Sequence, residues 1–222
     1  MAPGIDRRYH GVHGTGGRMI YDFLIDSYET ERIKVLTMWS MFPDDAFEIR
    51  PRQGDPRGRT LREHMIHQCV SENTWFCAML GIDVGAPPLP EDETRLAFLA
   101  RYATDSDHRL AALRQTDEAW WKEQATFFEL HLSRAWIMTR RIAHTAHHRG
   151  QQSMLLRQLG RALHSTYGPT ADTGGLMQHQ APVIYPYPDV PSLLAGERAG
   201  GARRPLPGPG AHPSTERPSE SP

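Results

Sequence analysis

Residues 133–160 read SRAWIMTRRIAHTAHHRGQQSMLLRQLG, and this stretch decides the fold that the sequence predicts. It contains no proline, and its only glycine before the last position is Gly150. It is rich in Arg, Ala, Met, Leu and Gln, which favour helix. Ser133 suits the N-cap, and Gly160 suits the residue that follows the last turn. The sequence therefore predicts one long helix over residues 133–160.

Three histidines lie within five positions of this helix: His144, His147 and His148. His144 and His148 stand one turn apart on the same face, roughly 5–6 Å apart at Cβ, so both imidazoles can reach one metal ion. His147 lies about 60° round the helix from His144 and could replace His148 in an i, i+3 pair, but it points less squarely along the same line. We take His144 and His148 as the candidate pair, which needs a further ligand to make a convincing metal site.

Apolar periodicity predicts three more helices. The first covers residues 18–41 and stops at Pro43. The second covers residues 60–80 and begins with TLRE, a capping box in which Thr60 and Glu63 exchange hydrogen bonds. The third runs from about residue 91 to 113. Four helices of this length, with no βαβ pattern or internal repeat, favour an all-α four-helix bundle.

The connections and ends of the chain are expected to differ from the bundle. The linker VGAPPLP, residues 84–90, cannot be helical because of its prolines, and residues 116–132 are apolar enough for a short strand-like or turn segment. We expect a flexible arm over 1–17, the bundle over 18–170, an extended Pro-rich strap packing on the bundle over 171–196, and a disordered tail over 197–222. Ten of the 18 prolines fall between 182 and 222, which supports the last two assignments.

Composition narrows the function classes. The net charge of −1 and the pI of about 6.9 give no field that would favour nucleic acid or a membrane surface. Cys69 and Cys77 lie eight residues apart on one predicted helix, roughly 12 Å apart, too far for a disulfide, so we expect reduced, buried thiols. No signal-peptide pattern appears, and no apolar run approaches the roughly 20 residues of a membrane span. We expect a soluble cytoplasmic protein.

His67 is the candidate third ligand. It lies in the middle of the second predicted helix, on a face of small and weakly polar residues, where burial is unfavourable unless the ring finds a partner. Three neutral imidazoles suit Zn, Ni, Fe or Cu, and three protein ligands leave the open position of a catalytic site. The alternative is that each histidine is an ordinary core or half-exposed residue, and spacing alone does not separate the two interpretations.

Three segments resemble the DinB-like (YfiT-type) family of metal-dependent four-helix bundles: RTLREHMIHQCVSENTWF at 59–76, WIMTRRIAHTAHHRGQQSMLLRQLG at 136–160 and YGPTADTGG at 167–175. That family has one histidine on the second helix, seven residues after the capping Ser or Thr, and an H-x-x-x-H pair on the last helix, often inside HHRGQ. On this sequence those positions are His67, His144 and His148. The resemblance covers roughly residues 18–170.

The resemblance implies a bundle with a crossover connection, a divalent transition metal (Zn, Ni or Fe), frequent homodimers, and chemistry with low-molecular-weight thiols such as bacillithiol or mycothiol. The leading interpretation is a metal-dependent enzyme that transfers such a thiol, or a similar small nucleophile, with a small-molecule substrate and neither nucleic acid nor membrane as partner. A stress-associated metal-binding bundle without turnover and a metal-assisted hydrolase are the alternatives.

The same two helices offer candidate substrate contacts. Arg140 and Arg141 lie one turn before His144, and Arg141 is the candidate that could hold a carboxylate, although two adjacent arginines are more often a solvated face. Gln151, two turns after His144, is a second candidate, either for substrate or for the ligand sphere. Glu63 could orient His67, but its place in the capping box already explains it. No general acid or base is fixed by spacing.

Overall fold

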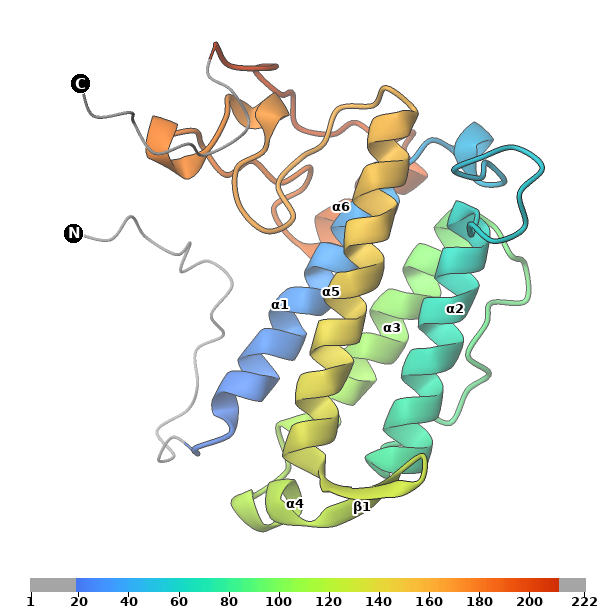
Figure 1. Ribbon diagram of the computed structural model, residues 1–222, viewed down its shortest axis with the longest axis vertical. Helices are drawn as coiled ribbons and strands as arrows, with labels where there is room; N and C mark the ends of the chain where they lie inside the picture. The colour runs from blue at the N-terminus through green and yellow to red at the C-terminus, as the bar shows by residue number, and fades with distance from the viewer. Residues whose placement is uncertain (1–18, 212–222) are drawn as a thin grey trace.

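The computed structural model describes residues 19–211, and four helices form its bundle: α1 (Asp22–Ser40), α2 (Leu61–Thr74), α3 (Arg95–Leu113) and α5 (Arg134–Gln158). Both α1 and α2 pack against α3 and α5, so α1 and α2 occupy opposite corners. In Figure 1, α1 and α5 run in one direction and α2 and α3 in the other, so the chain between α2 and α3 returns along the bundle. The predicted four-helix bundle with a crossover connection is confirmed.

The start of α2 is formed as predicted. The Thr60 hydroxyl accepts a hydrogen bond from the amide of Glu63, and the Glu63 carboxylate accepts one from the amide of Thr60. The α-helical pattern ends at Thr74 and continues as a π-helix, η3 (Trp75–Met79), before Gly81 turns the chain with φ +70°. A π segment rotates the side chains that follow it relative to an uninterrupted α-helix, and such segments recur at functional sites.

A short hairpin closes the end of the bundle where α5 begins. After α4 (Glu118–Lys122), β1 (Gln124–Phe127) pairs antiparallel with β2 (Leu130–Ser133). The Ser133 hydroxyl then caps α5 by accepting from the amide of Trp136 at 3.2 Å. The strand-like connection predicted from the apolar sequence is therefore present, and it leads directly into the helix that carries two of the candidate ligands.

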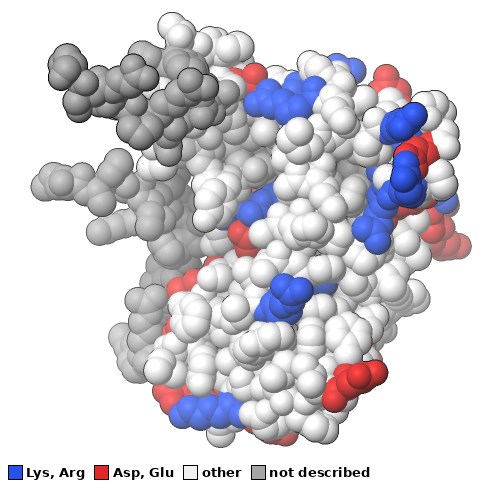
Figure 2. All heavy atoms as spheres, viewed as in Figure 1, with Lys and Arg blue, Asp and Glu red and all other residues white. Residues whose placement is uncertain are grey.

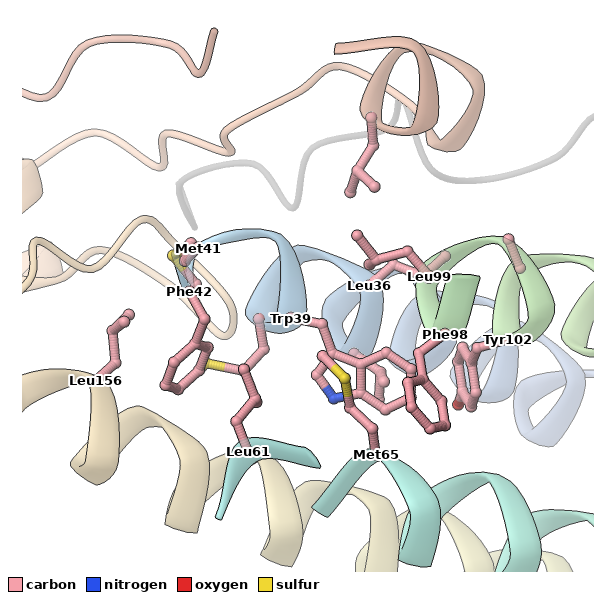
Figure 3. Close-up of a cluster of buried hydrophobic side chains, with 14 of the residues drawn as sticks. Leu36, Trp39, Met41, Phe42, Leu61, Met65, Phe98, Leu99, Tyr102 and Leu156 are labelled. Atoms are coloured by element: carbon pink, nitrogen blue, oxygen red, sulfur yellow. The ribbon is translucent and has the colours of Figure 1, made fainter. Parts of the chain in front are cut away.

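The core consists of two apolar clusters along the bundle. The cluster in Figure 3 draws on all four helices, with Trp39 from α1, Met65 from α2, Phe98 from α3 and Leu156 from α5. The second cluster, at the hairpin end, includes Trp75, Phe76, Trp121, Ile137 and Met138. On α5, His144 and His148 fall between residues of the second cluster and residues of the first, so this helix is anchored on either side of the site.

Within residues 19–211, none of the helices has the length and hydropathy needed to cross a lipid bilayer.

Both cysteines are free: Cys69 is buried as predicted, whereas Cys77, in the π segment, is exposed, so its predicted burial is wrong.

The prediction of an extended strap over 171–196 is wrong for its last part. Two short 3-10 turns, η4 (Ala171–Thr173) and η5 (Met177–His179), precede a helix, α6 (Val190–Arg198), which packs on α1 and α3. The Asp189 carboxylate caps α6 by accepting from the amide of Ser192 at 2.7 Å. A proline in the first turn is compatible with this helix because the first amides need no intrahelical partner.

The boundary placed at residue 197 is also wrong. The Glu197 side chain is buried, accepting from Arg95 at 2.7 Å and from the Tyr187 hydroxyl at 2.7 Å, so this part of the chain is held on the bundle and is not a solvated tail. The predicted arm over 1–17 and the end of the predicted tail, residues 212–222, lie outside the described residues.

Candidate metal centre

The structure brings together the three histidines selected from the sequence. His67 projects from α2 and His144 and His148 from α5. The Nε2 atom of His148 lies 3.0 Å from Nε2 of His67 and 3.1 Å from Nε2 of His144. One nitrogen from each of the three rings lies within 4.8 Å of the others. Rings 77 residues apart in sequence, at 67 and 144, thus converge on one point.

These distances fit a shared metal ion. Zinc–imidazole bonds of about 2.0–2.1 Å in a tetrahedron place ligand nitrogens about 3.3 Å apart, close to the two short separations found here. The donor set, three imidazoles, suits Zn and other divalent transition metals.

The hydrogen bond on the opposite edge of the His148 ring also supports a shared metal ion. The Nδ1 atom of His148 lies 2.9 Å from the amide oxygen of Gln151, which can only accept, so His148 carries its proton on Nδ1 and presents a lone pair at Nε2. That lone pair can accept from His67 or from His144, but not from both. The Nδ1 atom of His144 is moreover buried without a hydrogen-bond partner among the described residues. No placement of protons on neutral rings turns both Nε2···Nε2 contacts into hydrogen bonds, whereas one cation can accept the lone pairs of all three Nε2 atoms.

The electrostatic environment keeps these rings neutral. Burial, followed by the charge of Arg141, lowers the pKa of His144 from 6.5 to about 3. Burial lowers the pKa of His148 to about 4, although the hydrogen bond to Gln151 acts in the opposite direction. Burial and then Arg59 lower the pKa of His67. All three imidazoles are therefore in the form that metals bind near pH 7.

The converging nitrogens face a cavity of about 440 Å³. Besides the three histidines, its walls are Arg59, Arg140, Ala143 and His147. His147 therefore lies in the pocket wall, with its ring centroid 5.0 Å from that of His148, and it is not a member of the ligand group. Arg59 was not predicted from the sequence, because it precedes the capping Thr60 and belongs to no helical period. Three ligands on one side and open space on the other is the arrangement typical of catalytic metal sites.

Arg141 does not have the predicted role of substrate contact. Its side chain is 1% exposed, lies 3.5 Å from the Glu72 carboxylate and donates to Ser71 and Thr145. The other interpretation, a solvated face, fits Arg140, which is exposed at the pocket, but not Arg141.

Gln151 and Glu63 are explained by other contacts. Gln151, predicted as a substrate contact or as part of the ligand sphere, orients His148 through the amide contact to its Nδ1. The Glu63 carboxylate caps α2 by accepting from the amide of Thr60, and it forms an ion pair with Arg50 at 2.6 Å.

Trp75 holds the plane of the His144 ring. The two rings stack, with centroids 5.6 Å apart and an interplanar angle of 15°. Phe127 of the hairpin packs edge-on against Trp75 at 5.1 Å, and the Arg141 guanidinium lies 5.6 Å from the indole. Trp75 is the first residue of the π segment. The irregular end of α2 therefore positions an aromatic ring against a candidate ligand.

A buried charged network lies next to the site in the bundle interior. Glu72, 1% exposed, accepts from the hydroxyls of Tyr28 at 2.7 Å and Tyr102 at 3.0 Å and pairs with Arg109 at 3.3 Å and Arg141 at 3.5 Å. Burial and the neighbouring carboxylate raise the pKa of both tyrosines, so they remain hydrogen-bond donors. The charge of Glu72 is thus compensated by two guanidinium groups, and one of these, Arg141, also donates to Thr145, the residue after His144.

A fourth histidine, His64, lies behind the ligand group. It is 4% exposed, its ring centroid is 5.8 Å from that of His148, and its Nδ1 is buried without a partner in the described part of the chain. Burial, followed by the charge of His148, lowers its pKa to about 4. His64 was not predicted as a site residue, although its spacing of three residues from His67 is a signal in the sequence.

Comparison with known proteins agrees with the fold. The model of the DinB family matches residues 21–177. A DinB-like protein from Bacillus cereus has a TM-score of 0.58 at 18% identity, covering 66% of this chain and 97% of its own. YfiT from Bacillus subtilis, described as a probable metal-dependent hydrolase with an unusual four-helix bundle topology, has a TM-score of 0.50 at 16% identity, covering 69% and 95%. A search of curated proteins found no match.

Proposed function

The chain belongs to the DinB family, and from that premise we propose that it is a metal-dependent enzyme that delivers a small nucleophile, in the first instance a low-molecular-weight thiol, to an electrophilic substrate. The observation that carries the proposal is the convergence of three neutral imidazole nitrogens at the wall of a cavity. His67, His144 and His148 hold the metal, and the cavity holds the reactants.

A divalent metal bound there would lower the pKa of a thiol or water at its open position, so that thiolate or hydroxide forms near neutral pH. The chain's own groups have separate tasks. Gln151 fixes the tautomer of His148, and Trp75 fixes the plane of His144. His147 is the remaining imidazole in the pocket wall, and it is placed to accept the proton that the nucleophile gives up.

Hydrolysis is the second candidate, and the description of YfiT as a probable metal-dependent hydrolase favours it. The same site would then activate water in place of a thiol, because both are small nucleophiles that fit an open metal position. The two reactions differ in whether a thiol is consumed, so they can be separated by experiment.

The test uses purified full-length protein loaded with Zn²⁺, Ni²⁺ or Fe²⁺ and analysed for bound metal. Monochlorobimane is then offered with a low-molecular-weight thiol, and a p-nitrophenyl ester is offered without one. Metal-dependent thiol conjugation supports the proposal, and ester cleavage without thiol consumption supports the hydrolase. One bound metal with neither reaction would show a metal-binding bundle without turnover. His147→Gln should slow turnover and leave metal stoichiometry unchanged.

A further inference from the structure

Two guanidinium groups in the pocket wall have no ion-pair partner among the described residues. Arg59, in the loop before α2, and Arg140, on α5, are both exposed, and neither side chain forms a hydrogen bond or ion pair with any residue between 19 and 211. Other arginines nearby are paired: Arg50 with Glu63 at 2.6 Å and Arg62 with Glu93 at 2.7 Å. Figure 2 shows basic side chains on the face that α2 and α5 present. The pocket therefore offers two free cations.

A second cavity adjoins the first. It has a volume of about 470 Å³ and shares Arg59 and His67 with the metal-facing cavity. Its other walls are mostly hydrocarbon: Pro56, Ile66 and Val70, with Val70 38% exposed. Its one acidic wall residue, Glu63, is already neutralised by Arg50 and by the cap of α2. This cavity therefore suits an uncharged, apolar group.

We infer that the site takes a small carboxylate with a hydrocarbon body. Arg59 and Arg140 bind the carboxylate, which guanidinium groups can hold through two parallel hydrogen bonds. The hydrocarbon part lies in the second cavity against Ile66 and Val70, where it leaves water. The inference deepens the proposed function and rests on it for the reacting end of the substrate. The binding preference itself depends only on the walls of the two cavities.

The test measures binding of hexanoate, hexanamide and acetate by chemical-shift titration, first to metal-free protein and then to the zinc-loaded protein. Hexanoate should bind about tenfold more tightly than hexanamide, because hydrogen bonds to a charged group are stronger than those to a neutral one. It should also bind more tightly than acetate. Arg59→Gln and Arg140→Gln should each weaken hexanoate several-fold and leave hexanamide unchanged. Val70→Ser should reduce the advantage of hexanoate over acetate.

The control variant is Arg161→Gln, which removes the same charge from an exposed arginine just beyond α5. An equal effect of Arg161→Gln, or equal affinity for hexanoate and hexanamide, would overturn the inference. If inorganic phosphate binds as tightly as hexanoate, the assignment of a hydrocarbon group to the second cavity is wrong. Because the first titration needs no metal, failure of the protein to bind zinc would count against the proposed function alone and would leave this test decisive.

Discussion

Replacing Gln151 should change metal affinity in a direction set by the replacement. Its amide oxygen accepts from Nδ1 of His148 at 2.9 Å, on the opposite ring edge from the metal-facing Nε2. Loss of such a partner to a metal-binding histidine typically costs 10–100-fold in affinity. Gln151 is exposed and supplies one neutral hydrogen bond, so we expect Gln151→Leu to weaken zinc binding by about tenfold, or about 1.4 kcal/mol.

Gln151→Glu should have the opposite effect. A carboxylate accepts the same proton with roughly twice the strength and makes the imidazole a better donor to metal, so zinc should bind several-fold more tightly. Competition against a chromophoric zinc chelator at constant pH measures both variants. Gln115→Leu, at an exposed glutamine beyond α3, is the matched control and should bind zinc like the unaltered protein. Equal affinities for the Leu and Glu variants would refute the assigned tautomer and, with it, the argument that His148 is a ligand.

Three further results are expected. His67→Ala should reduce bound zinc, measured by elemental analysis after dialysis, to well below one per chain; full stoichiometry would exclude His67 as a ligand. Glu72→Gln leaves two buried guanidinium groups without their acid and should lower the free energy of unfolding by about 3–5 kcal/mol in urea titrations. The metal-free protein should lose stability as pH falls from about 6.5 to about 4. The unfolded chain binds protons over this range, whereas folding lowers the pKa values of His64, His144 and His148 to about 4, 3 and 4, so these rings stay unprotonated in the folded protein. A urea midpoint that is constant over this range would contradict the expectation.

The features that could be predicted from the sequence are those that depend on neighbours in the chain. The capping box at Thr60 involves residues three apart, and the pairing of His144 with His148 needs only the helical repeat. Apolar spacing was enough to predict the four bundle helices. The choice of His67 combined a local observation, a polar ring on a face of small residues, with the family resemblance, and the structure places that ring at the pair.

The features that were missed depend on contacts between distant segments. Arg141 has the same local setting as Arg140, but only the fold reveals that Glu72 draws it into the interior. Glu197 looked like the beginning of a solvated tail, because Arg95, its buried partner, lies 102 residues earlier. The π segment at Trp75 has no compositional signal either, since the indole and the hairpin ring of Phe127 meet only in the folded protein.

The charged layer beside the site gives a reason for the register of α2 and α5. His67 and Glu72 lie on α2, and His148 and Arg141 lie on α5, so sliding one helix by a turn would separate the ring pair and the ion pair together. Apolar side chains alone resist such a slip weakly, because a neighbouring apolar layer can replace the lost contacts. A buried carboxylate facing two guanidinium groups has no comparable substitute, since misalignment leaves uncompensated charge in the core. We therefore interpret the Glu72 network as what fixes the two helices in the one alignment that lets three imidazoles meet.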